Sequence, residues 1–337
     1  MIREAIEAVV SGESLSLKAA AQAMNEIMSG EATPAQFGAF VTALRLKGET
    51  VDEIAGMAQV MRQHSLQVEV DGALVDTCGT GGDGSGTFNI STTAAFVAAG
   101  AGAKVAKHGN RAMSGSSGSA DVLEALGANI ALSPESVARC INETGFGFMF
   151  AQGFHPSMRF AAGPRREIGI RTVFNILGPL TNPAGAGAQV IGVADAPMAA
   201  KMAQALSRLG SKRALVVHGN DGLDEITIAD STQVWELNEG AVSEYSISPE
   251  DLGLDKSPLS EVQVSNTAQS AQTLRDVLDG GTSAARDIVL LNAAAALLAG
   301  GQVDSLQDGV AAAAKSIDEG SANSRMEAFI ALSQSLE

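Results

Sequence analysis

A run of glycines constrains the fold of this chain more than any other feature. Five of the eight residues in 79–86 are glycine, and the run lies between an apolar segment, 73–79, and an Ala-rich segment that starts near Ser91. Glycine permits positive φ angles and lets backbone N–H groups approach a ligand closely. A tight turn without a ligand is the alternative, which so many glycines disfavour. A strand, a glycine loop and a helix start therefore predict a phosphate-binding site.

The loop does not match two common nucleotide-binding loops. Residues 79–84 fit G-x-G-x-x-G, but a dinucleotide site also needs an acidic residue about 20 positions later. The only charged residues of 84–120 are Lys104, Lys107 and Arg111, all basic. No G-K-[ST] closes the run, which excludes the ATP-type P-loop.

The basic residues after the loop stand out because the chain has a formal net charge of −16. A surface this acidic repels nucleic acid and anionic membranes, so an anionic substrate needs a locally basic site. A second basic stretch, 151–194, predicts another anion-binding surface, since guanidinium groups bind carboxylates in pairs of hydrogen bonds. The alternative is that some of these arginines only form ion pairs at the surface; this applies to Arg159 and Arg166 and, more weakly, to Arg171. The stretch contains Arg159, Arg165, Arg166 and Arg171.

Residues 1–70 predict helices only. In 33–48, apolar residues recur at helical spacing from Phe37 to Leu44, and Thr33 followed by proline is typical of a helix start. Thr50 and Glu53 have the spacing of a capping box.

Beyond residue 70, short apolar runs alternate with Ala-rich helical segments. The alternation predicts a mostly parallel sheet with helices on both faces. Residues 226–248 are typical of antiparallel edge strands. We therefore expect an α/β fold with a small N-terminal all-helical domain, 1–70, and a larger α/β domain, 71–337. The runs expected as strands are 73–79, 103–109, 128–132, 146–151, 188–194 and 214–219.

Composition indicates a cytoplasmic protein. Cys78 and Cys140 are too few for a disulfide framework, which favours a reducing compartment. The first apolar run carries Glu4 and Glu7, unlike a signal peptide, and no stretch is apolar enough to span a membrane.

An acidic pair, Asp224 and Glu225, lies in a Gly- and Asp-rich segment after the last parallel strand. Such a pair is often only surface charge. A diphosphate ligand would favour a metal role, because Mg²⁺ binds carboxylates together with phosphate oxygens, and Ser91 could add a hydroxyl.

Four blocks in this order resemble the anthranilate phosphoribosyltransferase family along essentially the whole chain. They are DTCGTGGDGSGTFNIST, KHGNRAMSGSSGSADVLEALG, GPRREIGIRTVFNILGPLTNPA and DGLDEIT. The resemblance implies transfer of the phosphoribosyl group of phosphoribosyl pyrophosphate (PRPP) to anthranilate in tryptophan biosynthesis, with two Mg²⁺ ions. It also implies a homodimer through the helical domain, and helices near 165–185 that pack onto that domain.

The same resemblance implies residue roles but no general base. Anthranilate is expected at Gly79, Asn110 and Arg165, and the metals at Ser91, Asp224 and Glu225. Asp83 either binds ribose hydroxyls or stabilises the loop. The residues expected to bind PRPP are Gly79, Gly82, Asp83, Thr87, Asn89, Ile90, Ser91, Thr92, Lys107, His108, Gly109, Asn110, Arg111, Ala112, Met113, Ser114, Gly115 and Ser119.

The chain departs from the family at Ser116, where a lysine is common, so a lysine contact from this loop is in doubt. A pyrimidine nucleoside phosphorylase of the same architecture is the main alternative, but it would carry a KxSGR-type loop where this chain has KHGNR. An inactive nucleic-acid-binding relative is a second alternative, which the charge of −16 opposes.

Overall fold

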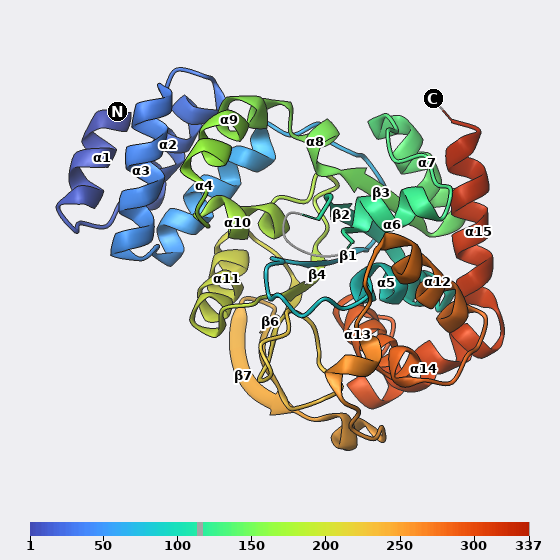
Figure 1. Cartoon of the computed structure of the whole chain (residues 1–337). Helices are drawn as coiled ribbons and strands as arrows, with labels where there is room; N and C mark the ends of the chain where they lie inside the picture. The colour runs from blue at the N-terminus through green and yellow to red at the C-terminus, as the bar shows by residue number, and fades with distance from the viewer. Residues whose placement is uncertain (113–116, 337) are drawn as a thin grey trace.

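The computed structural model of the chain describes residues 1–112 and 117–336. A group of N-terminal helices lies beside a larger α/β part built on one sheet, as Figure 1 shows. This arrangement confirms the expected fold class. No helix of the described residues is both long and apolar enough to cross a membrane.

The N-terminal helices begin where their capping residues predict. Thr33 accepts a hydrogen bond from the Gln36 N–H, and Thr50 accepts one from the Glu53 N–H, so both expected helix starts are confirmed. Phe37 and Leu44 lie on the buried side of their helix. The helices of this group are α1 (Ile2–Val10), α2 (Leu17–Met28), α3 (Pro34–Lys47) and α4 (Val51–Gln63).

The sheet has the strand order β3-β2-β1-β4-β5-β6-β7. The first five strands in this order are parallel, and β6 and β7 add to one edge of the sheet in antiparallel fashion, as expected for this segment, with β7 as the edge strand. Parallel strands bring their carboxyl ends to one edge of the sheet. The strands are β1 (Leu74–Gly79), β2 (Lys104–Gly109), β3 (Phe146–Phe150), β4 (Ala188–Gly192), β5 (Arg213–Gly219), β6 (Thr232–Asn238) and β7 (Ala241–Ile247).

The strand expected at 128–132 is wrong. Side chains rather than a neighbouring strand bind its backbone: the Asn129 N–H donates to Ser333 Oγ, and the Ala131 N–H donates to Asn129 Oδ1. Ile130 and Leu132 are nevertheless buried in the core. The apolar side chains of this run thus contribute to the core, although the run is not part of the sheet.

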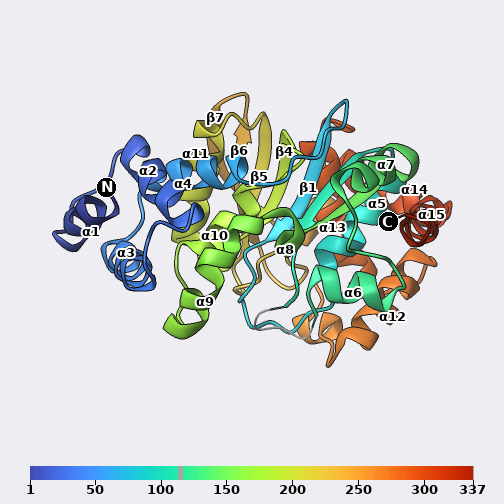
Figure 2. The same cartoon turned by 90° about the horizontal axis from the view of Figure 1, so that it is seen from above.

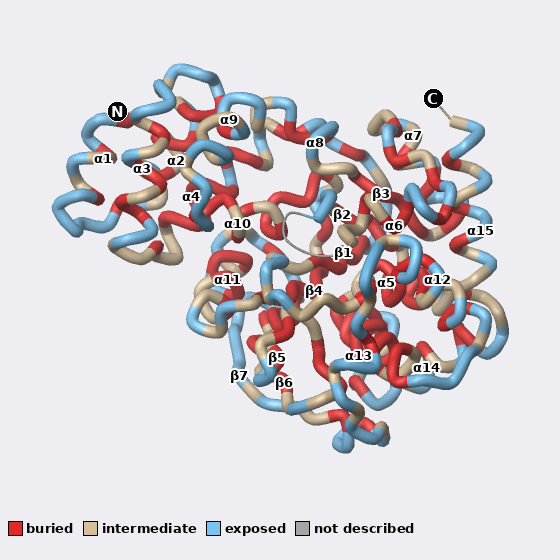
Figure 3. The backbone as a smooth tube through the Cα atoms, viewed as in Figure 1, coloured by how far each residue is buried: buried red, intermediate tan, exposed pale blue. Residues whose placement is uncertain are grey.

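Helices cover both faces of the sheet, as Figure 2 shows from above. Side chains of β5 alternate between the two apolar clusters: Leu215 and Val217 face α5 (Ile90–Gly100) and α13 (Ala284–Ala299), whereas Ala214 and Val216 face α11 (Ala196–Arg208) and the N-terminal helices. The tube in Figure 3 shows that α5, α13 and the central strands form the most buried part of the molecule.

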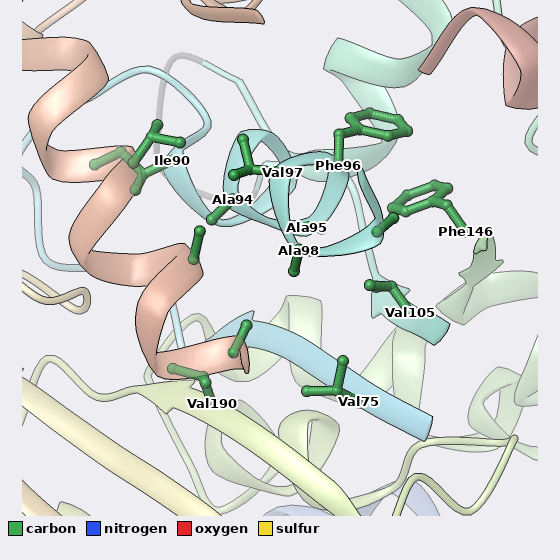
Figure 4. Packing of buried hydrophobic residues seen from close by; sticks show 14 of the residues in the cluster. Val75, Ile90, Ala94, Ala95, Phe96, Val97, Ala98, Val105, Phe146 and Val190 are labelled. Atoms are coloured by element: carbon green, nitrogen blue, oxygen red, sulfur yellow. The ribbon is translucent and has the colours of Figure 1, made fainter. Parts of the chain in front are cut away.

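Helix α5 is held tightly over the sheet. Its small residues, such as Ala95 and Ala98, lie above Val75 and Val190, and Phe96 stacks on Phe146 with ring centroids 4.2 Å apart (Figure 4). This packing fixes the direction in which the N-terminus of α5 points. The helices around α5 and α13 are α6 (Ser119–Ala125), α7 (Pro134–Thr144), α12 (Thr267–Leu278), α14 (Leu306–Asp318) and α15 (Ser321–Gln334).

After β3 the chain returns to the N-terminal helices. It forms α8 (Ala151–Phe154), α9 (Arg159–Ile168) and α10 (Phe174–Leu177) before entering β4. Helix α9 contacts α2 and α3, and α10 contacts α4. The segment between α9 and α10 therefore connects the two parts of the molecule.

Candidate functional site

The expected site residues gather at the carboxyl edge of the parallel strands. The glycine run follows β1, the KHGN sequence ends β2, and the acidic pair lies in the loop after β5. The carboxyl edge is where ligands bind in open α/β sheets. Segments that are far apart in the sequence thus meet at one place.

Two glycines allow the acidic loop to approach the strand ends. A Cβ at Gly79 would lie 2.5 Å from Asp224 Oδ2, and one at Gly192 would collide with the Asp224 backbone. The Asp224 carboxylate then accepts a hydrogen bond of 2.7 Å from the Gly81 N–H. A charged side chain therefore holds the tip of the glycine loop, where Gly81 and Gly82 have φ of 66° and 81°.

The N-terminus of α5 carries donors and hydroxyls toward this loop. Asn89, rather than Ser91 or Thr92, is the capping residue, because its Oδ1 accepts a hydrogen bond from the Thr92 N–H. The Thr92 Oγ1 is buried, and it has no hydrogen-bond partner within residues 1–112 and 117–336. A buried hydroxyl of this kind suits a ligand oxygen, since buried polar groups are nearly always hydrogen-bonded. Ile90 is buried in the core, and Thr87 pairs with Gln263.

Lys107 is buried beneath the N-terminus of α5. Its ammonium donates to the Thr77 carbonyl and lies 3.2 Å from Ser91 Oγ. Burial lowers the pKa of Lys107, and the negative charges of Asp76 and Glu225 oppose this shift. A cation is thus held below the point where a phosphate would approach Ser91.

Asp76 supports this arrangement from within the sheet. Burial raises the pKa of its carboxyl to about 6, and it accepts hydrogen bonds from the His108 N–H and the Asn182 amide. The Asn182 amide also donates to the Ala106 carbonyl. The network joins β1, β2 and the TNP sequence, and our sequence analysis assigned no role to Asp76 or Asn182.

The acidic pair has the electrostatics of a cation site. Burial raises the pKa of Asp224 to about 7, and the nearby Asp83 adds to the shift. Burial and then the charge of Asp224 raise the pKa of Glu225 well above its usual range. A bound cation would relieve both effects. Asp83 also accepts a hydrogen bond of 3.2 Å from the Ser85 N–H, which stabilises the turn.

The oxygen donors of this site suit a Mg²⁺ ion that is bound partly by substrate and water, but they are too few to enclose a metal ion by themselves. Among the described residues, no group of three or more His, Cys, Asp or Glu side chains could hold a metal ion. Mg²⁺ commonly takes one or two carboxylates and completes its coordination with substrate phosphates and water. Asp224, Glu225 and the hydroxyl of Ser91 match that pattern.

The segment after β2 is partly committed to internal contacts. Arg111 forms ion pairs with Asp121 at 3.1 Å and with Glu124, so its charge is not free for an anion in this structure. Asn110 and Ala112 are exposed, and Ser119 begins α6. Gly109 ends β2 against Phe148. Four residues of the segment lie outside the described residues: Met113, Ser114, Gly115 and Ser116.

The four arginines of the second basic stretch contact different parts of the molecule. The half-buried Arg165 stacks its guanidinium over Phe174 at 5.3 Å, and burial lowers its pKa. Arg171 donates to the Gly81 carbonyl, and Arg159 lies over Phe160. Arg166 is exposed and forms no ion pair with any described residue. Arg165 and Arg166, in the last turn of α9, and Arg171, just after it, thus lie on the segment that leads to the site, and Arg171 contacts the glycine loop directly.

His108 has a partner that the sequence did not indicate. Its Nε2 lies 3.2 Å from Nε2 of His155, and both rings are buried. Burial and the neighbouring His155 lower the pKa of His108 to about 3, and burial lowers the pKa of His155 to about 4. Both rings are therefore neutral near pH 7. The two residues are 47 positions apart, so no local pattern pairs them.

Comparison with known proteins gives full-length matches. The helical bundle domain of the glycosyl transferase family matches residues 3–65, and its a/b domain matches residues 71–323. The anthranilate phosphoribosyltransferase of Herpetosiphon aurantiacus is 59% identical, with 98% of each chain covered. That of Moorella thermoacetica is 54% identical, also with 98% of each chain covered.

Solved structures agree. The anthranilate phosphoribosyltransferase of Thermus thermophilus superposes with a TM-score of 0.93 at 44% identity, covering 98% of this chain and 99% of that one. The Saccharomyces cerevisiae enzyme, in complex with PRPP and Mg, gives a TM-score of 0.90 at 30% identity, covering 99% and 98%.

The histidine pair predicts a specific dependence of stability on pH. Unfolded histidine has a pKa near 6.5, above both folded values, so the unfolded state takes up protons first as the pH falls. The contribution of the two histidines to stability is greatest above pH 6.5, and we expect it to fall by about 2 kcal/mol per histidine by pH 5. The buried carboxyls of Asp76 and Asp224 have raised pKa values and shift stability the opposite way over this range. Urea unfolding of wild type and variant at pH 7.5 and pH 5 therefore measures the histidine part as the difference between the two proteins. His155→Gln should remove roughly half of the loss.

His64→Gln is the control, because His64 is only partly buried and its partners, Asn25 and Ser157, do not belong to the pair. We expect this variant to keep the wild-type difference between the two pH values. An equal difference in wild type and His155→Gln would show that the pair does not titrate as described.

Proposed function

Because the chain belongs to the anthranilate phosphoribosyltransferase family, we propose that the site at the carboxyl edge of the sheet binds PRPP, Mg²⁺ and anthranilate. The chain transfers the phosphoribosyl group of PRPP to the amino group of anthranilate, a step of tryptophan biosynthesis, and releases pyrophosphate. One observation supports this placement above the others: the glycine loop, the N-terminus of α5, Lys107 and the acidic pair converge there.

PRPP would lie between the glycine loop and the start of α5. The N–H groups of the loop and of the first turn of α5 point a partial positive charge at the phosphates. The unpartnered Thr92 hydroxyl and the Ser91 hydroxyl would bind oxygen atoms of the ligand. The proposed contacts are Gly79, Gly82, Asp83, Thr87, Asn89, Ile90, Ser91, Thr92, Lys107, His108, Gly109, Asn110, Arg111, Ala112 and Ser119, together with the undescribed Met113, Ser114 and Gly115.

Asp224, Glu225 and Ser91 would hold two Mg²⁺ ions, with Glu225 shared between them. When bound, Mg²⁺ neutralises negative charge on the pyrophosphate. The raised pKa values of both carboxyls support a cation at this place, since a positive charge favours their ionised forms.

Breaking the bond to pyrophosphate leaves positive charge on the ribose and negative charge on the leaving group. Lys107, placed 3.2 Å from Ser91 Oγ, and the N–H groups of α5 would stabilise the negative charge. The aromatic amine of anthranilate is already neutral at pH 7, so no general base is needed to activate it. His108 and His155 are neutral and would bind or orient rather than carry charge.

Anthranilate would bind where Gly79, Asn110 and Arg165 approach the ribose. The guanidinium of Arg165 suits the anthranilate carboxylate, and its burial strengthens such a pair because water does not screen it fully. Holding both substrates in one orientation supplies much of the rate, on the order of several kcal/mol.

The alternative, a pyrimidine nucleoside phosphorylase, lacks such support. The relatives that cover the whole chain are named as anthranilate phosphoribosyltransferases, and residues 107–111 read KHGNR. The sequence therefore favours PRPP over a nucleoside as the sugar donor.

The reaction itself can be followed directly. We expect anthranilate fluorescence to fall when the protein is mixed with PRPP, anthranilate and Mg²⁺, because the amine is converted into a glycosylated amine. Omitting PRPP is the control and should leave the fluorescence constant. Phosphorolysis of thymidine or uridine, without loss of anthranilate, would contradict the assignment.

Glu225→Gln tests the metal assignment. Removing one carboxylate charge should raise the Mg²⁺ concentration needed for half-maximal activity about tenfold and lower kcat by about 10²-fold. Asp230→Asn is the matched control, since Asp230 is exposed in the same loop and accepts a hydrogen bond from the Ser231 N–H. A Glu225→Gln protein with the wild-type Mg²⁺ titration would remove Glu225 from the site.

We also propose two domains, 1–70 and 71–337, a homodimer formed through the first of them, and a cytoplasmic location. Two exposed apolar side chains support the dimer: Val10 on α1 and Leu46 on α3 are 68% and 83% exposed, and the two helices contact each other. Two free buried cysteines agree with a reducing compartment.

Light scattering tests the dimer. We expect the mass of a dimer for wild type and that of a monomer for Leu46→Glu, because a buried charge disfavours the interface. Leu66→Glu alters an exposed leucine outside α1 and α3 and should leave the mass unchanged. Equal masses for the two variants would contradict an interface at Leu46.

A further inference from the structure

Charged side chains hold both backbone polar groups of Gly81. Asp224 Oδ2 accepts a hydrogen bond from its N–H at 2.7 Å, and Arg171 Nη2 donates to its carbonyl at 2.9 Å. The guanidinium also packs directly on Gly82, where any Cβ would collide with Nη1. We propose that Arg171 is a positioning residue that holds the glycine loop in the conformation that binds PRPP.

The backbone around Arg171 is well anchored. Gly169 ends α9 in a left-handed conformation, and the Thr172 N–H donates to Asn175 Oδ1. Val173 is buried in the apolar cluster that contains the N-terminal helices and α11. The exposed arginine therefore extends from a fixed point to the loop. An arginine that only covered the surface would need no such anchor.

The tip of the glycine loop has few other contacts. Gly81 and Gly82 are exposed and have no side chains, so the tip cannot be held by apolar packing. The loop is also held at its two ends: the Thr80 N–H donates to the Gly192 carbonyl, and Gln263 donates to the Ser85 carbonyl. Within the loop, Thr80 Oγ1 donates to the Gly81 carbonyl at 3.4 Å, and the Ser85 N–H donates to Asp83 Oδ1. From other parts of the described chain, the hydrogen bonds to the backbone of the tip come from Arg171 and Asp224.

The two contacts are not equivalent under the proposed function, on which this inference rests. Asp224 is a proposed ligand of Mg²⁺, so a cation would compete with the Gly81 N–H for its carboxylate. Arg171 has no such second task. It remains available to hold the Gly81 carbonyl while the substrate binds.

A loop that is already ordered binds its ligand more tightly, because less conformational entropy is lost on binding. Loss of Arg171 should therefore weaken PRPP binding and have much less effect on anthranilate, whose proposed contact Arg165 is held separately by Phe174. A general loss of stability would weaken the binding of both PRPP and anthranilate.

Arg171→Ala, Arg171→Lys and Arg166→Ala test the proposal, with Arg166→Ala as the control because Arg166 is exposed on the same segment and forms no ion pair with a described residue. Amide hydrogen exchange of peptides covering 79–86 in the protein without substrates is the first readout. We expect exchange to be about fivefold faster in Arg171→Ala and unchanged in the control. Exchange of peptides from α5 should stay at the wild-type rate.

The steady-state constants are the second readout. The KM for PRPP should rise about tenfold in Arg171→Ala, while the KM for anthranilate stays within about twofold. Arg171→Lys should recover most of the difference, since one donor is enough for a carbonyl. A direct bidentate contact with phosphate would not be recovered by lysine.

Two results would overturn the proposal: wild-type exchange and KM values in Arg171→Ala, or no recovery in Arg171→Lys. Failure of the proposed function is distinguished by the wild-type protein, which would then show no turnover of PRPP and anthranilate. Hydrogen exchange still reports the role of Arg171 in that case. Unfolding midpoints of the three variants identify any variant that loses its fold.

Discussion

The loop between β5 and β6 reaches the carboxyl edge of the sheet only because Gly79 and Gly192 have no side chains there. Any larger residue at Gly192 would collide with the backbone of Asp224. This close approach brings the acidic pair after β5 next to the glycine loop after β1. Without it, the carboxylates, Ser91 and Lys107 would not share one site. Gly79 and Gly192 thus act by letting two loops approach each other, not through a positive φ angle, which neither of them has.

The close approach also concentrates charge in a buried place. Lys107 is attracted by the negative charges of Asp76 and Glu225, while Asp83 raises the cost of ionising Asp224, and Asp224 raises that of Glu225. Such groups do not stabilise the fold by themselves, since burial of charge costs more than a single partner returns. Phosphates and Mg²⁺ would complete the charge balance. An anion bound here would meet the charge of Lys107, which is buried away from the acidic surface.

The sequence was informative where local patterns decide the structure. Capping residues located the helix starts at Thr33 and Thr50, and the glycine run located the loop. Prediction from the sequence failed where contacts between distant parts of the chain determine the structure. Residues 128–132 are apolar because they are buried, yet side chains bind their backbone. Arg111 was counted as free charge, but Asp121 and Glu124 neutralise it after one helical turn brings them near. His155 could not be paired with His108 because the pairing depends on the order of strands.

The segment between α9 and α10 connects the chemistry to the helical part of the molecule. Its ends pack on α2, α3 and α4, whereas Arg171 contacts the glycine loop and Arg165 lies beside Phe174. A shift of the N-terminal helices would move this segment, because Val173 and Phe174 belong to the apolar cluster that those helices share. Movement of Arg171 would then displace Gly81, and this would alter the hydrogen bond between Gly81 and Asp224. Through this chain of contacts, the position of the helical part can influence the conformation of the glycine loop.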